Sequence, residues 1–512
     1  MRCFTCKLKQ HTPLIHFQHD QEGATLRASE VKPKLDKYIL SVLGNGNYQD
    51  GINQAKINGW LIGKGDHPAL DYKVRIIDNT PDNLFSITPN EKRVYTESDE
   101  RRDRDRNYTI MIVNEGDIIL HPNIGQRCRY VILKDGKRYF GKLRKKDSKI
   151  IYDLSGYPLF FANLDSDITD ATEYKNLVFA EDPFEMVLRA RDNHLLDFIK
   201  QDGLLSSFFM THNFGMRQSK GFGSFYLDED DPLYKVPSSR YYFNLQINEA
   251  NFSAEFYTLF KDIELFSRTL RAGINEKRGA RTVFYFKSLA FIYCKNVLNA
   301  EWDKKRVKTE FYFDSATRRN DSLEEQRYRY PNNDDNYDIL FYDATDGYDI
   351  RDLMGFSTNE EWQSYKDSIE KKIALKDTED SRLRFPTRDD SLPVERMRSP
   401  LLVKPICRVG DDGSVQYNIY LVFQDNLVGM EEFKRHQKIC FYSKREIDNN
   451  TGRPKRFMID LPANFSMESY FDYILGPLNF DISEHIEERF QEHEFYYILK
   501  DIYSQLKDNL SV

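Results

Sequence analysis

Short runs in which apolar and polar residues alternate are concentrated in the first half of the chain and predict strands. The clearest run is RYYFNLQIN, residues 240–248, where Tyr241, Phe243, Leu245 and Ile247 fall on one face. This spacing is typical of a half-buried strand. Similar runs, bounded by Gly, Asp or Asn, are NGWLIG around Trp60, DYKVRIID from Asp71, YTIMIV from Tyr108 and KIIYDL from Lys149.

Helical spacing of apolar residues marks other segments. Asp182 and Pro183 form a capping pair that predicts a helix ending near Gly203. A mid-chain helical region and a C-terminal helix follow, and for both the pattern favours packing on the core over a partner-binding surface. The mid-chain stripe is Phe256, Leu259, Phe260, Ile263, Phe266 and Leu270, with a second apolar run over 283–302; the C-terminal stripe is Ile482, Ile486, Phe490, Phe495, Ile498, Ile502 and Leu506.

Three highly charged stretches with little periodicity are predicted to be loops. They begin at Glu91, Arg318 and Lys376. In the first, residues 91–106, six basic residues are offset by six acidic ones, which favours a solvated loop over a nucleic-acid tail. In the second, residues 327–330 alternate Arg and Tyr, a pattern suited to base stacking and phosphate contact, although a solvated loop is the favoured alternative.

Length and composition place the chain among globular proteins. Its 512 residues are enough for about two to four domains, and 40% are hydrophobic. The 32 Tyr and 36 Phe serve equally well as core or as stacking platforms for bases. We find no signal-peptide-like segment and no apolar run of about 18 residues, so we expect a cytoplasmic protein without a membrane partner.

The charge balance argues against a simple free-standing RNA binder. The chain has 74 basic and 81 acidic residues, a net charge of −7. A local basic groove is still compatible with this total, because salt screens charges over about 8–10 Å. The six cysteines show no framework spacing, and Cys3 and Cys6 lack the further ligands of a zinc site. We therefore predict no metal site and no cofactor.

The most informative segment is FGMRQSKGFGSF, residues 214–225. Gly215, Gly221 and Gly223 permit positive φ and close approach, while Arg217 and Lys220 supply charge for phosphates. Such a loop can cradle a polynucleotide backbone; the alternative is a glycine-rich hairpin or strand entry. The order of elements does not fit a dinucleotide-binding fingerprint, and no GKS or GKT is present.

A second basic segment precedes it in the chain. TPLIHFQHDQEGATLRASEVKPKLDKYI, from Thr12, predicts a strand, a turn through Gly23 and a helix carrying Lys32, Lys34 and Lys37. With the glycine-rich loop and with VERMRSPLLVKPI from Val394, this segment resembles the RAMP superfamily of CRISPR proteins. The similarity is greatest to the large two-domain subunit of the Cmr-type III effector complexes. The family's tryptophan-rich helix is replaced here by one with Tyr38.

The resemblance implies an α+β fold of two ferredoxin-like (RRM-like) RAMP domains with a helical insertion. We expect an N-terminal RAMP-like domain with the glycine-rich loop over 1–245, the helical insertion over 246–310 and a C-terminal RAMP-like domain over 311–512. The implied function is an RNA-binding subunit of a type III-like antiviral complex, which holds guide or target RNA and whose partners are other CRISPR effector subunits.

The resemblance and the residue types together give a set of expected RNA-binding residues in the two basic segments. The cations would meet phosphates, and polar residues would add hydroxyl or backbone contacts. For the N-terminal lysines the alternative is a solvated helix face. The set is Arg27, Ser29, Lys32, Lys34, Gly215, Arg217, Gln218, Ser219, Lys220, Gly221, Phe222 and Gly223.

Two other functions remain open. Some RAMP relatives cut precursor RNA without metal, with a histidine as general base; His16, His19 and His212 are the candidates here, while Asp20 and Asp36 are weaker metal-dependent ones. The other is a non-catalytic scaffold that docks on partner proteins through its acidic, aromatic-rich second half. We favour RNA binding without catalysis.

Overall fold

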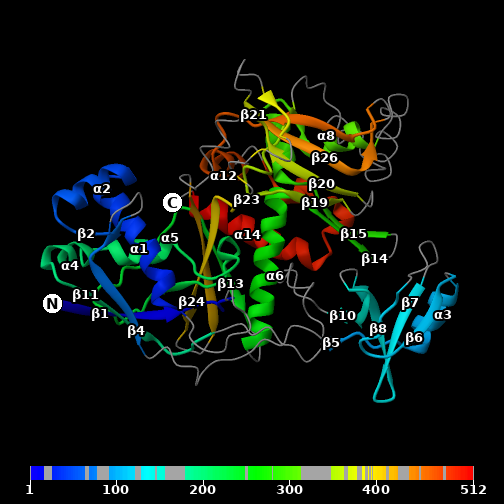
Figure 1. Cartoon of the computed structure of the whole chain (residues 1–512), viewed down its shortest axis with the longest axis horizontal. Helices are drawn as coiled ribbons and strands as arrows, with labels where there is room; N and C mark the ends of the chain where they lie inside the picture. The colour runs from blue at the N-terminus through cyan, green and yellow to red at the C-terminus, as the bar shows by residue number, and fades with distance from the viewer. Residues whose placement is uncertain are drawn as a thin grey trace.

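The chain folds into mixed helices and sheets, which confirms the α+β class (Figure 1). Among the described residues no helix combines the length and apolar character needed to cross a bilayer. The computed structural model describes residues 2–510 except 16–25, 64–67, 78–90, 106, 121–127, 145–146, 156–178, 248–251, 279–280, 313–346, 363–366, 377–382, 387–389, 391–393, 395, 411–413, 425–437, 449–450 and 477–479.

The N-terminal region is built on a four-stranded antiparallel sheet of order β12-β1-β11-β4. Its inward-facing residues, such as Leu8 and Met186, share one core with Val31, Leu35 and Ile39 of α1. The predicted basic helix is thereby confirmed and fixed against the sheet. The elements are β1 (Arg2–Gln10), α1 (Ala28–Leu43), α2 (Tyr48–Ile57), β4 (Tyr72–Ile77), β11 (Phe184–Ala190), α4 (Asn193–Ile199), α5 (Leu204–Thr211) and β12 (Phe225–Leu227).

Two predictions for this region are wrong. The helix expected from Asp182 is instead β11 followed by α4, because alternate residues of 184–190 are buried between β1 and β4 and this pairing outweighs the local capping signal. The first strand was expected from Thr12, but β1 ends at Gln10. Pro13 lacks the backbone N–H that a strand ladder requires.

A separate small unit is inserted between β4 and β11, and it lies apart from the rest of the chain at the lower right of Figure 1. It has the sheet order β6-β7-β8-β9, and its own apolar clusters include Val131 and Ile132. The predicted loop at 91–106 is wrong, since α3 forms there and its Asp103 is buried against Arg129 at 2.9 Å. The elements are α3 (Glu97–Asp105), β6 (Thr109–Val113), β7 (Cys128–Lys134), β8 (Lys137–Arg144) and β9 (Lys149–Tyr152).

A three-stranded sheet of order β13-β25-β24 joins segments from both halves of the sequence. The predicted strand is confirmed as β13 (Tyr242–Ile247), and the predicted apolar stripe is confirmed in α6 (Phe252–Arg271). Besides its helices, the segment 246–310 contains a β-hairpin, in which residues 281–286 pair with residues 274–278 instead of forming a helix. Its other elements are β14 (Ile274–Arg278), β15 (Arg281–Phe286), α7 (Leu289–Asn296) and α8 (Asp303–Phe311); the partner strands of β13 are β24 (Leu401–Val409) and β25 (Val415–Phe423).

A six-stranded mixed sheet of order β16-β17-β27-β26-β20-β19 forms the C-terminal layer. The C-terminal helix is predicted as continuous, but it is interrupted: α13 (Ile482–His485) ends at Ile486, whose backbone is extended, and α14 spans Glu494–Leu510. The strands are β16 (Glu301–Trp302), β17 (Gly347–Tyr348), β19 (Asn359–Trp362), β20 (Asp367–Ile373), β26 (Lys438–Ile447) and β27 (Pro454–Asp460), with α12 (Met467–Leu475) beside them.

The two-residue strands of the described chain complete this inventory. They are β2 (Leu61–Ile62), β3 (Ala69–Leu70), β5 (Glu91–Lys92), β10 (Leu154–Ser155), β18 (Phe356–Ser357), β21 (Leu375–Lys376), β22 (Leu383–Arg384) and β23 (Arg396–Met397).

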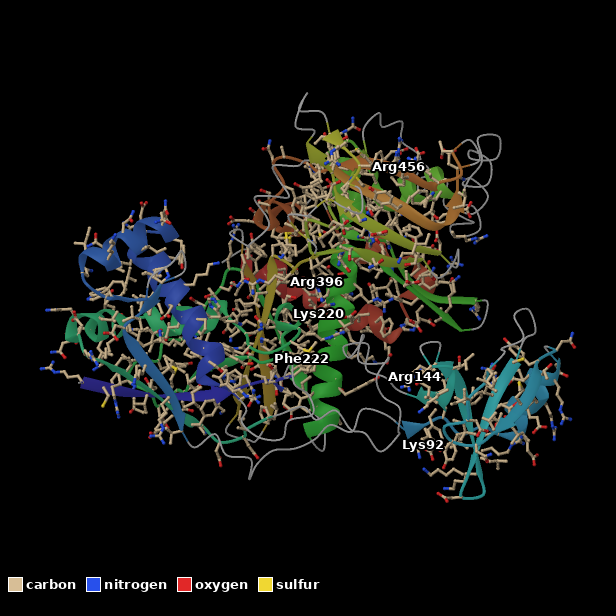
Figure 2. All side chains as sticks on the ribbon, in the orientation of Figure 1. Lys92, Arg144, Lys220, Phe222, Arg396 and Arg456 are labelled. Atoms are coloured by element: carbon tan, nitrogen blue, oxygen red, sulfur yellow. The ribbon has the colours of Figure 1, made fainter. Side chains whose placement is uncertain are left out.

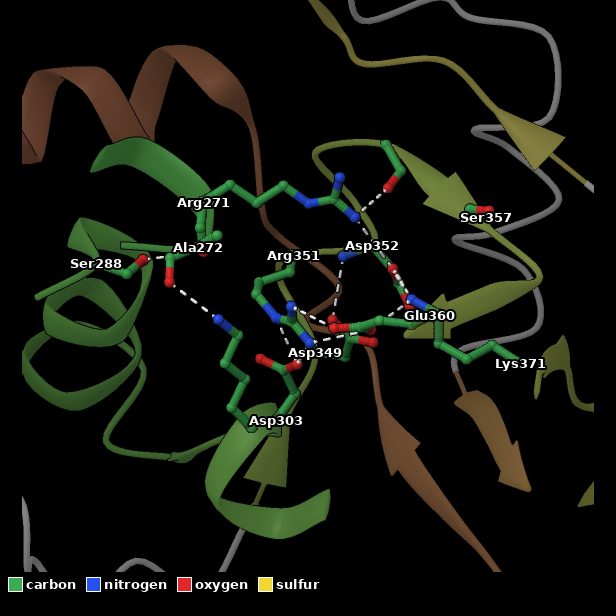
Figure 3. Close-up of polar contacts among 12 residues, drawn as sticks. Arg271, Ala272, Ser288, Asp303, Asp349, Arg351, Asp352, Ser357, Glu360 and Lys371 are labelled. Atoms are coloured by element: carbon green, nitrogen blue, oxygen red, sulfur yellow. Dashed lines mark hydrogen bonds and ion pairs between the residues drawn. The ribbon is translucent and has the colours of Figure 1, made fainter. Parts of the chain in front are cut away.

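A buried ionic network links α8, β19, β20 and residues 349–355 (Figure 3). Arg351 donates to Asp303 at 2.6 Å and to Glu360 at 2.9 Å. Lys371 donates to Asp352 at 2.6 Å and to Glu360 at 3.2 Å. Burial alone would raise the pKa of Glu360, but Arg351 and Lys371 hold that pKa well below its ordinary value.

This network anchors the turn at Gly355, which contacts residues 396–400 just before β24. Arg271, at the end of α6, donates to the carbonyl oxygen of Gly355 at 2.6 Å. A Cβ at Gly355 would lie 3.3 Å from the backbone nitrogen of Ser399, so this turn abuts residues 396–400. The pairing of β18 with β23 holds the same segment at Met397. The network therefore sets the position of the strand entry that carries Arg396 and Arg398.

We expect Lys371→Met to lower the free energy of unfolding by about 3–5 kcal/mol, because Asp352 and Glu360 would lose a buried ammonium partner. Lys372→Met is the matched control, since this neighbouring lysine pairs with Glu370 near the surface and should cost no more than about 1 kcal/mol. Denaturant unfolding of both variants measures the difference. Equal losses would show that the network contributes nothing beyond an ordinary surface pair.

Candidate nucleic-acid interface

The glycine-rich loop, residues 214–225, is pinned to the residues that follow β1. The backbone N–H of Met216 donates to the carbonyl oxygen of Ile15 at 2.8 Å, and that of Gly223 donates to Pro13 at 2.9 Å. The Thr12 hydroxyl donates to the carbonyl oxygen of Gly221 at 2.7 Å and accepts from the backbone N–H of Ser224 at 2.9 Å. The loop is therefore a rigid part of the N-terminal domain.

Its glycines are required by contacts within the protein. Gly215, Gly221 and Gly223 all have positive φ and are buried. A Cβ at Gly223 would lie 2.0 Å from the carbonyl oxygen of Phe214, and one at Gly215 would lie 2.5 Å from that of Ile15. The close approach that the sequence predicts is thus made to the chain itself.

Phe222 also belongs to the core. Its side chain is fully buried, and its ring stacks on Phe260 of α6 with centroids 3.7 Å apart. Figure 2 shows Lys220 and Phe222 beside this helix. Because the ring of Phe222 is buried and already stacked on Phe260, it is not available to stack on a base.

The polar residues of the loop remain partly exposed. Lys220 pairs with Glu264 of α6 at 2.8 Å. Burial would raise the pKa of Glu264, but Lys220, Arg268 and Arg217 lower it below its ordinary value. Three cations therefore act on this one carboxylate.

Helix α1 meets the loop through Lys34. Its ammonium donates to the carbonyl oxygen of Asn213 at 2.7 Å and to Oε1 of Gln218 at 2.8 Å. The two basic segments of the sequence are thus in direct contact. Lys32, by contrast, donates to Asp36 at 2.7 Å and lies over the Tyr72 ring, since residues two apart on a helix diverge by about 200°.

The start of β24 brings in residues that the sequence-based list of binding residues omits. Gln424 donates through its backbone N–H to the carbonyl oxygen of Pro400 at 2.8 Å and through Nε2 to that of Thr211 at 2.6 Å. Arg396 and Arg398 are exposed on either side of the buried Met397. The Arg-x-Arg spacing before Ser399 and Pro400 is the sequence signal that could have identified them.

Where α1, the loop and residues 396–400 meet, cations lower one another's pKa or that of a neighbouring histidine. Burial and the nearby Arg398 lower the pKa of Lys34 to about 8, despite the opposing effect of Glu30. Burial also lowers the pKa of His212 to about 4, with further contributions from Lys34, Arg398 and Lys404. An anion placed among these groups would relieve their mutual repulsion.

The other predicted residues are distributed as follows. Arg27 precedes α1 and is partly exposed, and Ser29 is exposed in its first turn. His16, His19, Asp20 and the Arg/Tyr run at 327–330 lie outside the described residues. Asp36 pairs with Lys32, and within the described part of the chain no group of three or more His, Cys, Asp or Glu side chains is arranged to hold a metal ion.

Comparison with known proteins finds matches to two family models. The model of the Cmr1 N-terminal domain matches residues 1–127 and 129–274, and that of the Cmr1 C-terminal domain matches residues 285–502. Together they cover nearly the whole chain and confirm the resemblance seen in the sequence. A search of curated proteins finds no match.

We expect Gly223→Ala to destabilise the loop more than Gly452→Ala does. Both glycines have φ of +64°, so both variants incur the left-handed penalty of about 1–2 kcal/mol. Only Gly223 also meets a backbone oxygen, which should add about 1–3 kcal/mol, whereas nothing lies within 4 Å of a Cβ at Gly452. Thermal unfolding of the two variants compares them; equal shifts would contradict the packing role.

Proposed function

Because the chain belongs to the Cmr1 family of large RAMP subunits of type III CRISPR complexes, we propose that it holds guide or target RNA within such a complex. Base pairing between the two RNAs would supply the sequence specificity. The protein would contribute phosphate contacts and positioning.

The proposal includes the fold and its division. We propose two ferredoxin-like domains, over about residues 1–245 and 311–512. The four-stranded antiparallel sheet with α1 and α5 supports the first of them. The unit at residues 91–155 is then an insertion between two strands of that sheet.

The observation that carries the RNA-binding proposal is the convergence of cations where α1, the glycine-rich loop and the start of β24 meet. We call this the basic junction. Its direct links are the bonds of Lys34 to Asn213 and Gln218 and the bridge of Gln424 between Thr211 and Pro400. Its cations are Lys34, Arg217, Lys220, Arg268 and Arg398, with Arg396 near Lys220 in Figure 2, and the carboxylates that act on them are Glu30 and Glu264.

A concentration of cations is significant in this chain because its net charge is −7. Charges beyond about 8–10 Å are screened, so the local excess governs attraction of a polyanion. Arg and Lys side chains beside exposed Ser29 and partly exposed Ser219 suit contacts to phosphate and sugar.

A protein-docking scaffold is the main alternative, and salt dependence separates the two. RNA binding through several phosphates weakens steeply with salt, whereas docking on a protein responds less. A metal-independent nuclease is the other alternative. RNA cutting without metal that His212→Ala abolishes would favour it.

We expect the double variant Arg217→Glu, Lys220→Glu to bind a short unstructured RNA at least about tenfold more weakly at physiological salt. Loss of two phosphate contacts should also flatten the slope of log affinity against log salt by about 1–2. Fluorescence anisotropy at several salt concentrations measures both quantities.

The matched control is Lys56→Glu with Lys137→Glu, which makes the same charge change at exposed positions on α2 and at the β7–β8 turn. It should change affinity by less than about threefold, because these positions lie outside the basic junction. Wild-type affinity in the Arg217/Lys220 variant, or an equal loss in the control, would contradict the assignment of the loop.

We expect RNA affinity to fall as pH rises from about 7 to 9, because the pKa of Lys34 is lowered to about 8 and the protonated form is the one that attracts phosphate. Lys34→Met should weaken binding about five- to tenfold at neutral pH and flatten this pH profile. Lys56→Met, at an exposed lysine on α2, should leave the profile unchanged. A profile that stays equally steep in Lys34→Met would exclude Lys34 as its source.

A further inference from the structure

His212 lies directly after α5, within electrostatic reach of Lys34 and Arg398 of the basic junction. Its ring packs between Phe208 and Tyr38, with centroid distances of 4.6 and 5.9 Å. The backbone around it is held from the other side, since Lys404 donates to its carbonyl oxygen at 3.0 Å. The imidazole therefore has a fixed orientation.

The hydrogen bonds of the ring fix its tautomer. Nδ1 lies 2.9 Å from the carbonyl oxygen of Phe208, which can only accept, so Nδ1 carries the proton. Burial and three nearby cations keep the ring neutral, with a pKa of about 4. Nε2 is therefore a hydrogen-bond acceptor. Among the described residues, none forms a hydrogen bond with it.

The charged groups that act on this acceptor come from three elements. Lys34 belongs to α1, Arg398 to the entry of β24 and Lys404 to β24 itself. Lys404 is fully buried, and its three protons are taken by the carbonyl oxygens of His212 and Phe225 and by Oδ1 of Asn213. Lys34 and Arg398 are the two that remain partly or fully exposed.

An acceptor within electrostatic reach of two cations suits a ligand that combines a hydroxyl donor with an adjacent anion. A ribonucleotide has this combination, because its 2′-hydroxyl neighbours the 3′-phosphate. Deoxyribonucleotides retain the phosphate and lack the donor. The lysine and arginine side chains only donate, so they bind either backbone and cannot distinguish RNA from DNA.

We propose that His212, Lys34 and Arg398 form a subsite for one ribonucleotide, in which Nε2 of His212 accepts the 2′-hydroxyl and the two cations bind the adjoining phosphate. The inference rests on the proposed RNA-binding function and goes further in naming a residue that selects RNA over DNA.

The test compares RNA and DNA of the same short unstructured sequence on the full-length protein by fluorescence anisotropy. His212→Asn keeps a donor near the position of Nδ1 and removes the acceptor, while His212→Gln restores an acceptor near the position of Nε2. The RNA preference of wild type should fall about three- to tenfold in His212→Asn and be largely kept in His212→Gln. Lys34→Met should weaken RNA and DNA binding equally.

A second arm needs no variant. Chimeric RNAs with a single 2′-deoxy residue are scanned along the sequence on wild-type protein, with the RNA held in one register by a complementary guide strand. One position should lose about three- to tenfold in affinity. If His212→Asn fails to fold, this experiment still tests whether the protein recognises one 2′-hydroxyl.

Failure of the proposed RNA binding and failure of the His212 subsite would give different results. Absence of salt-dependent RNA binding in wild type would refute the proposed function and the subsite with it. RNA binding whose preference over DNA is unchanged in His212→Asn, or a 2′-deoxy scan without a sensitive position, would overturn the subsite alone.

Discussion

The structure depends on one buried lysine side chain. Lys404 lies on β24, is fully buried, and donates to the carbonyl oxygens of His212 and Phe225 and to Oδ1 of Asn213. A buried amino group is tolerated only when its hydrogen bonds are satisfied, so this lysine fixes the position of the sheet β13-β25-β24 against the glycine-rich loop. Asn213 reinforces the contact by donating to the carbonyl oxygen of Val403 at 2.9 Å. Residues almost two hundred positions apart are thereby held as one surface.

The remaining parts of the basic junction are positioned by two different kinds of constraint. The glycine-rich loop is set by steric fit, since a side chain at Gly223 would overlap the backbone of Phe214. The entry of β24 is set by charge, because the buried network of Arg351 and Lys371 holds the turn at Gly355 against Ser399. Both arrangements hold the backbone of the basic junction in place, and such preorganisation lowers the entropic cost of binding the proposed RNA ligand.

The local electrostatics make the proposed binding of RNA compatible with an acidic net charge. Ion pairs neutralise charge elsewhere, as where Glu100 of α3 pairs with Arg138 of the inserted unit. At the basic junction the lowered pKa values of Lys34 and His212 both reflect burial next to further positive charge. The same repulsion that costs stability in the free protein would be relieved by phosphate, so binding strength and the strain of the empty site have one source.

The sequence by itself determined the features that depend on near neighbours. The alternation at 242–247 and the apolar stripe of α6 correspond to real elements, and the order of the basic motifs indicated the family. Contacts between distant segments decided the rest. Strand β11 formed where a capping pair indicated a helix, and Phe222 packed in the core against Phe260. Arg398 came within electrostatic reach of His212, in a region where Gln424 links Thr211 to Pro400. Periodicity reports which face of an element is buried, whereas the partner that buries it is chosen by packing and hydrogen bonding across the whole chain.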